Sequence, residues 1–162
     1  MGKKWLDIVY NEKSSTKLKQ HYKFWAHDYD RDLLDWGYAY PYQLKKIMSK
    51  DIKVKKDSKI LDAGCGTGLV AQVFSDLNFK NIVGLDYSID MLKIAKNKKI
   101  YKRLIQDSLN KKTSLRSNQF DIVLCTGVLT SGHVGAKAIN ELIRVTKNKG
   151  YLILSIAESI YE

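Results

Sequence analysis

Asp62-Ala63-Gly64-Cys65-Gly66-Thr67-Gly68 is the stretch that decides the fold class of this chain. It follows an apolar segment, and its glycines allow a tight turn with a close approach of the main chain to a ligand. Outward from this turn, short apolar segments alternate with helical patterns. We expect strands at 59–63, 81–85, 100–105, 120–125 and 151–156, with helices over 69–77, at 89–97, and from Ala138 to a stop at Asn148-Lys149-Gly150. This alternation predicts βαβ units, and hence an α/β, Rossmann-like and mostly parallel sheet with helices on both faces.

The first 50 residues differ from the rest, because they hold all three tryptophans. Ser14-Ser15-Thr16 can cap a helix with Trp25 on its apolar face. The chain should break at Asp35-Trp36-Gly37, and Pro41 can then sit in the first turn of a second helix. We therefore expect an N-terminal helical cap at 1–50 and a Rossmann-like domain at 51–162.

Ligands of such sheets bind at the carboxyl ends of the strands, which is where the glycine turn falls. A dinucleotide fingerprint needs a third glycine at the position of Leu69, and no Gly-Lys-Ser or Gly-Lys-Thr triplet follows for a phosphate loop. A nicotinamide-dependent oxidoreductase is therefore a disfavoured alternative. The next strand ends in Gly84-Leu85-Asp86, where a carboxylate can accept hydrogen bonds from both hydroxyls of a ribose.

The pattern Asp-x-Gly-x-Gly-x-Gly after an apolar strand, followed by Asp86, resembles the cofactor motifs of class I methyltransferases. The resemblance implies S-adenosylmethionine as cofactor and S-adenosylhomocysteine as product. It also implies that Asp86 binds the ribose, that Met91 packs on the adenine, and that Asp107 binds the adenine amino group. The expected cofactor-binding residues are Tyr29, Asp62, Gly64, Cys65, Gly66, Gly68, Asp86, Tyr87, Met91, Asp107, Ser108, Thr126 and Gly127.

Two further stretches are similar to the methyltransferase-like family named for the Williams–Beuren syndrome region. They are Thr126-Gly127-Val128-Leu129-Thr130-Ser131-Gly132-His133-Val134-Gly135 and Tyr22-Lys23-Phe24-Trp25-Ala26-His27-Asp28-Tyr29-Asp30. The resemblance implies that Tyr29 lies over the methionine end of the cofactor and that Thr126-Gly127 flanks it. It implies methyl transfer by in-line displacement to an acceptor that the resemblance does not name.

Such a reaction needs alignment more than proton transfer, because the methyl group is already activated on a sulfonium. If the acceptor must lose a proton, His133 is the candidate base, since an imidazole takes up a proton near neutral pH. Tyr29 is the candidate for orienting the acceptor. Both residues have a non-catalytic alternative. His133 can be a structural or solvent-facing histidine, and Tyr29 can simply pack against its neighbours.

In the methyltransferases that the chain resembles, a helix and two more strands follow the fifth strand, whereas this chain ends at Glu162. We therefore expect five strands in the order 3-2-1-4-5, without strands 6 and 7. The apolar fifth strand would form an exposed edge open to self-association. Cofactor binding should survive this shortening better than turnover. The alternative function is an S-adenosylmethionine-binding protein without catalysis, such as a regulatory partner of another methyltransferase.

The net charge of +11 comes from 28 basic residues, of which only Arg31, Arg103, Arg116 and Arg144 are arginines. No basic stretch is interleaved with aromatic residues, so a small-molecule or protein acceptor is favoured over a nucleic acid. No apolar run approaches the roughly 18 residues that span a bilayer, and the N-terminus is too polar for a signal peptide. The two cysteines match no zinc pattern. We expect a cytoplasmic protein without a metal site or a membrane partner.

Overall fold

The structure is a computed structural model that describes residues 3–12, 14–129, 134 and 137–156 of the chain. Its centre is a five-stranded sheet in the order β3-β2-β1-β4-β5, in which every neighbouring pair is parallel. The strands are β1 (Ile60–Ala63), β2 (Ile82–Asp86), β3 (Arg103–Gln106), β4 (Phe120–Leu129) and β5 (Thr146–Ile156). The α/β class and the strand order predicted from the sequence are both confirmed.

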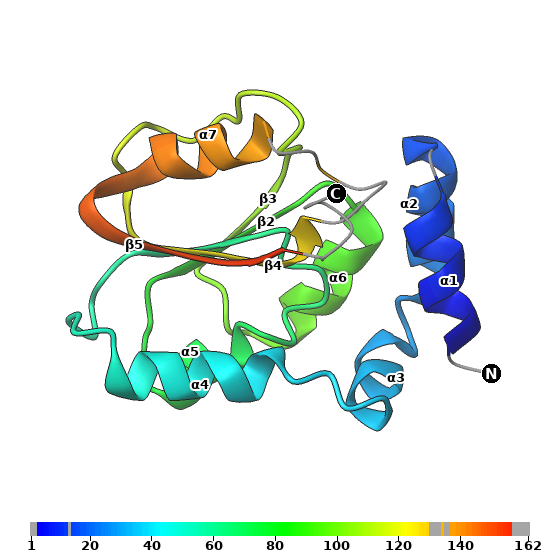
Figure 1. Cartoon of the computed structure of the whole chain (residues 1–162), viewed down its shortest axis with the longest axis horizontal. Helices are drawn as coiled ribbons and strands as arrows, with labels where there is room; N and C mark the ends of the chain where they lie inside the picture. The colour runs from blue at the N-terminus through cyan, green and yellow to red at the C-terminus, as the bar shows by residue number, and fades with distance from the viewer. Residues whose placement is uncertain (1–2, 13, 130–133, 135–136, 157–162) are drawn as a thin grey trace.

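Helices cover both faces of this sheet (Figure 1). They are α1 (Lys3–Asn11), α2 (Ser15–Trp25), α3 (Tyr29–Asp35), α4 (Tyr40–Lys50), α5 (Gln72–Asp76), α6 (Ile89–Asn97) and α7 (Lys137–Val145). In Figure 1, α4 and α5 lie below the sheet and α7 lies above it, while α1, α2 and α3 stand to one side, beyond α6. None of the described helices is long and apolar enough to cross a membrane.

Successive side chains of the central strands point to opposite faces of the sheet, so the core has two layers. On one face, Ile60 of β1 and Ile122 of β4 pack with Leu44 of α4 and Phe74 of α5. On the other face, alternate residues of β1 and β4 pack with Leu142 of α7. All four residues of β1 are buried, because helices cover both faces.

A third apolar cluster holds α1, α2 and α3 together around Trp25. The Trp25 ring meets Tyr29 edge to face at 4.6 Å between centroids and stacks on Trp36 at 5.8 Å. Its indole N–H donates a hydrogen bond to Asp32 at 3.0 Å. The cluster also contacts Tyr87, which follows β2, so the N-terminal helices pack onto the end of the sheet where the strands terminate.

Asp30, in the first turn of α3, fastens these helices to the glycine turn. Its carboxylate accepts a hydrogen bond from the Thr67 hydroxyl and forms an ion pair with Lys98, the residue that follows α6. We call this group of three the Asp30 tether. It joins three segments that are far apart in the sequence.

Lys98→Met should loosen the tether, because the ion pair with Asp30 is only partly exposed. We expect a loss of about 1 kcal/mol in the free energy of unfolding and faster hydrogen exchange of the α3 amides. Lys96→Met is the matched control, since Lys96 is an exposed lysine of α6. Unchanged exchange in α3 of the Lys98 variant would contradict a fastening role.

Several local predictions are confirmed and others are wrong. Ser14 caps α2 with its side chain, the chain turns at Gly37 with φ +75°, and Pro41 lies in the first turn of α4. The third strand begins at Arg103 rather than at 100, because Tyr101 turns beneath the glycine turn instead of joining the sheet. The helix expected over 69–77 forms only as α5, since the chain is still turning through 69–71.

The last two elements differ most from expectation. The fourth strand continues to Leu129 instead of ending at Cys125, through an irregularity in its pairing with β5. The last helix ends at Val145, not at 148–150. The carbonyls of Arg144 and Val145 accept hydrogen bonds from the backbone of residues 118 and 119, and Thr146 already pairs with Phe120 of β4. β5 forms the sheet edge, and its pairing with a second chain stays a prediction.

Candidate functional site

The glycine turn lies directly after β1, where β2 and β4 flank it. Gly64, Gly66 and Gly68 have φ angles of +76°, +52° and +85°, a region that favours glycine. A Cβ on Gly64 would lie 2.2 Å from a methyl group of Val128, so no side chain fits there. A Cβ on Gly66 would meet nothing within 4 Å, and this backbone therefore borders open space.

That space is a cavity of about 400 Å³ at the carboxyl ends of the strands, a size typical of small-molecule sites. Its lining includes every predicted cofactor residue except one: Tyr29, Asp62, Gly64, Cys65, Gly66, Asp86, Tyr87, Met91, Asp107, Ser108, Thr126 and Gly127. Gly68 is the exception. A Cβ there would lie 2.9 Å from the Tyr101 ring, so Gly68 serves the turn and the packing beneath it rather than the cavity.

Asp86 lies at the end of β2 with both carboxylate oxygens held by the backbone. One oxygen accepts a hydrogen bond from the Gly66 N–H and the other from the Ser88 N–H, each at 2.8 Å. Burial raises the pKa of Asp86, and the backbone hydrogen bonds oppose this effect. Each oxygen keeps a second acceptor site, so the carboxylate can still receive two hydroxyl groups from the cavity.

Asp62, at the end of β1, is buried beside Asp86. The Tyr101 hydroxyl donates a hydrogen bond to Asp62 at 2.7 Å. Burial raises the pKa of Asp62 to about 7, the hydrogen bond from Tyr101 opposes this, and the charge of Asp86 adds to it. Burial also raises the pKa of the Cys65 thiol, so Cys65 is present as a neutral thiol that contributes only its surface to the cavity. Tyr101 was not predicted as part of this site.

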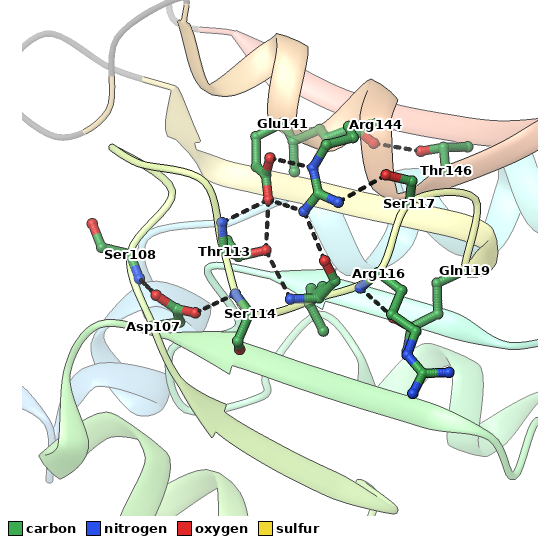
Figure 2. A network of polar contacts seen from close by, with 12 residues as sticks. Asp107, Ser108, Thr113, Ser114, Arg116, Ser117, Gln119, Glu141, Arg144 and Thr146 are labelled. Atoms are coloured by element: carbon green, nitrogen blue, oxygen red, sulfur yellow. Dashed lines mark hydrogen bonds and ion pairs between the residues drawn. The ribbon is translucent and has the colours of Figure 1, made fainter.

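Asp107 borders the cavity beyond β3 and is fixed by its own loop (Figure 2). It accepts hydrogen bonds from the Ser108 N–H at 2.8 Å and the Ser114 N–H at 2.9 Å. Partial burial raises the pKa of Asp107, but the hydrogen bonds and the nearby Lys111 together hold it below its usual value. Asp107 is therefore an ionised acceptor at neutral pH.

An ion pair between the buried Glu141 and the partly exposed Arg144 on α7 holds the other end of this loop (Figure 2). Glu141 accepts hydrogen bonds from the N–H of Thr113 at 2.8 Å and from its hydroxyl at 2.6 Å. Arg144 pairs with Glu141 at 2.6 Å and donates to the Leu115 carbonyl at 2.8 Å. A continuous set of hydrogen bonds thus runs from α7 to the segment that orients Asp107.

Residues of the N-terminal helices also line the cavity. Leu18, Lys19 and Tyr22 of α2 and Tyr29 and Leu33 of α3 line it. The Lys19 ammonium group lies 5.5 Å from the centre of the Tyr87 ring. The Tyr87 hydroxyl is buried and has no hydrogen-bond partner among the described residues, so a polar group of a ligand could satisfy it. The candidate base His133 lies outside the described residues.

Residues 61–154 match the family model of the methyltransferase domain, and this range contains the glycine turn, Asp86 and Asp107. The chain belongs to the methyltransferase domain family. The superfamily of S-adenosylmethionine-dependent methyltransferases, which the motifs resembled, is thereby confirmed, and S-adenosylmethionine is the cofactor of that family.

Sequence similarity to known proteins supports this assignment to the methyltransferase domain family. The chain is 35% identical over 136 residues to Methyltransferase-like protein 27 of Homo sapiens, covering 83% of this chain and 55% of the human protein. It is 32% identical over 145 residues to an uncharacterised protein of Methanocaldococcus jannaschii, covering 86% of this chain and 60% of that protein. The chain thus spans little more than half the length of these relatives.

A solved structure gives the same fold. It is the crystal structure of a putative S-adenosyl-L-methionine-dependent methyltransferase from Methanococcus maripaludis, with a TM-score of 0.69 and 19% identity. The alignment covers 83% of this chain and 64% of that chain. The likeness supports the Rossmann-like methyltransferase fold of the sheet described above.

Glu141→Gln should lower the free energy of unfolding of this methyltransferase domain by about 3 kcal/mol, because Arg144 loses its charged partner in a largely buried site. The Arg144 hydrogen bond and the two from Thr113 outweigh burial and lower the pKa of Glu141 to about 2. The contribution is therefore complete above the usual pKa of 4.5 and disappears as the pH falls toward 2. Urea denaturation at pH 7 measures the change.

The control is Asp90→Asn on α6. Asp90 pairs with Lys93 at the same spacing that separates Glu141 from Arg144, but the Lys93 side chain is 68% exposed and that of Arg144 is 21% exposed. The Asp90 variant should lose less than about 0.5 kcal/mol. Equal losses in the two variants would show that burial of the Glu141 pair contributes nothing.

Proposed function

We propose that this chain binds S-adenosylmethionine in the cavity beside the glycine turn and that it transfers the methyl group to an acceptor. The observation that carries the proposal is Asp86. Its buried carboxylate is held at the end of β2 by the Gly66 and Ser88 N–H groups, and it lines the cavity with acceptor sites to spare. This arrangement suits the two adjacent hydroxyls of a ribose.

The rest of the lining fits the other parts of the cofactor. Met91 and Tyr87 offer apolar surface to the adenine, and the ionised Asp107 can accept a hydrogen bond from its amino group. The open backbone at Gly66 leaves room for the amino-acid part of the cofactor, and the neighbouring Asp62 carboxyl can accept a hydrogen bond from its ammonium group. We therefore propose that the expected cofactor-binding residues that line the cavity contact S-adenosylmethionine, and that Gly68 only shapes the turn.

When bound, S-adenosylmethionine supplies a methyl group on a positively charged sulfur, and the bond to sulfur breaks as the acceptor forms its own bond to the carbon. The residues of this chain have to align the acceptor and exclude water. Tyr29 of α3 and Thr126-Gly127 of β4 line one cavity and so can enclose a reacting group between them. We propose that the first 50 residues act as a cap over the site, and that His133 serves as base where the acceptor carries a proton.

Calorimetric titration with S-adenosylhomocysteine tests the binding part of the proposal. We expect one site with a dissociation constant in the micromolar range and no heat from reduced nicotinamide adenine dinucleotide. A chain that is folded by circular dichroism but gives no heat with S-adenosylhomocysteine would contradict the proposal. Incubation of cell extract with the chain and a cofactor carrying a labelled methyl group then tests transfer, with the Asp86→Ala variant as control.

A further inference from the structure

A second, smaller cavity adjoins the cofactor cavity within the N-terminal helices. Its volume is about 140 Å³, and we call it the aromatic chamber. Its lining consists of Val9, Tyr22, Trp25, Tyr29, Leu33, Trp36, Gly37, Tyr38 and Gly127. Tyr22, Tyr29, Leu33, Tyr38 and Gly127 also line the larger cavity. The two cavities therefore share a wall and lie side by side.

The lining of the chamber favours an uncharged occupant. Aromatic side chains supply most of its wall, and none of the described residues that line it is a lysine, arginine, aspartate or glutamate. An anionic group placed there would lose its hydration without gaining a counter-charge, which is costly. A cationic acceptor would also have to approach the positive sulfur of the cofactor. Aromatic walls accept a flat ring through stacked or edge-to-face contacts.

The volume limits the size of the occupant. An apolar cavity of about 150 Å³ holds one benzene ring. The aromatic chamber, at about 140 Å³, therefore has room for a single six-membered ring. Any larger part of the occupant must extend into the neighbouring cavity.

Gly127 places the chamber at the reacting end of the cofactor site. It lies in β4, lines both cavities and has φ +69°. A Cβ at this position would lie 3.1 Å from the Tyr38 hydroxyl, so a side chain here would crowd the wall between the cavities. Glycine therefore keeps the two cavities connected. Gly127 lies on β4, whereas Asp86 ends β2 and Asp107 follows β3 on the other side of β1, so the proposed cofactor would lie between them.

We propose that the aromatic chamber binds the methyl acceptor, and that the acceptor presents a single uncharged aromatic ring to it. This inference rests on the proposed function, because it assigns the substrate class for the same site. The ring enters among Trp25, Trp36 and the tyrosines of α2 and α3. The atom that receives the methyl group then lies at Gly127, where the two cavities meet.

Phenol is the probe that tests the chamber, with and without saturating S-adenosylhomocysteine. Saturation-transfer NMR on the phenol ring protons and quenching of tryptophan fluorescence both report its binding. Val9→Phe fills the chamber and Trp36→Ala removes one wall, and both residues line the chamber without lining the cofactor cavity. Phe24→Ala, which changes a ring that is 71% exposed on α2, is the control.

We expect phenol to bind the unaltered chain, and its affinity to fall at least tenfold in each chamber variant and less than twofold in the control. S-adenosylhomocysteine affinity should change less than twofold in all three. Unchanged phenol affinity in Trp36→Ala overturns the proposal, even if Val9→Phe does not fold. Tighter binding of tetramethylammonium than of phenol overturns it as well. Absence of S-adenosylhomocysteine binding contradicts the cofactor assignment instead, while the phenol titrations still decide the chamber.

Discussion

Asp86→Ala should raise the dissociation constant for S-adenosylhomocysteine at least 100-fold. The variant removes both carboxyl oxygens that face the ribose, and each buried hydrogen-bonding group left without its partner costs about 1 to 3 kcal/mol. Two ribose hydroxyls bound by one carboxylate therefore account for a factor of this order. Calorimetric titration at pH 7.5 measures both constants. This is the largest change in affinity that any single side chain of the site should produce.

Asp86 also accepts hydrogen bonds from the Gly66 and Ser88 backbone, so its loss could disturb the turn itself. A ligand without the 2′-hydroxyl separates the two effects. The unaltered chain should bind this analogue at least tenfold more weakly than S-adenosylhomocysteine, whereas Asp86→Ala should bind the two alike. If the variant still distinguishes them, the carboxylate does not bind the ribose. Asp90→Ala, four residues later on α6, should bind both ligands like the unaltered chain.

Asp62→Asn should stabilise the fold above neutral pH by up to about 4 kcal/mol, the value that corresponds to a rise in pKa from 3.8 to about 7. Below pH 3.8 the carboxyl is protonated in both states. As the pH rises toward 7, the unfolded chain releases this proton while the folded chain retains it, so the free energy of unfolding falls. Asparagine never ionises, and its carbonyl can still accept the Tyr101 hydrogen bond.

Urea denaturation at pH 4.5 and pH 8 measures this effect as a difference between the variant and the unaltered chain. Titrating groups that do not interact with Asp62 contribute equally to both chains and cancel. The gain in stability should be small at pH 4.5 and largest at pH 8. Asp76→Asn, at an exposed aspartate of α5, is the matched control. A gain that is the same at both pH values would place the ionisation of Asp62 outside this range.

The sequence predicted the part of the fold in which local signals and tertiary packing agree. β1 and β2 are mostly apolar because helices cover both faces of the sheet, and α6 spans the residues expected for it. In the structure Ser88 caps this helix and accepts a hydrogen bond from the Met91 N–H. The glycine turn carries its own conformational requirement, so the position of the cofactor cavity followed from the sequence as well.

The sequence could not predict contacts between distant segments. Tyr101 lies inside the strand that was expected at 100–105, yet its hydroxyl reaches Asp62. Asp30 is an ordinary acidic residue at the start of a helix, and only the folded chain brings it to Thr67 and Lys98. Glu141 sits on an amphipathic helix where an exposed ion pair with Arg144 would have the same spacing. Only burial distinguishes the Glu141 pair from an exposed pair at the same spacing, and the spacing of residues in the sequence does not reveal burial.

The Asp30 tether has a consequence for how the two ligands influence one another. The helix that carries Tyr29 and Leu33, shared by both cavities, is fastened to the loop that contains Gly66. A ligand that orders either element lowers the entropic cost of ordering the other. Affinities at the two sites should therefore be positively cooperative, and thermodynamic reciprocity requires each ligand to strengthen the other by the same factor. Cutting the tether should abolish this cooperativity before it abolishes either binding event.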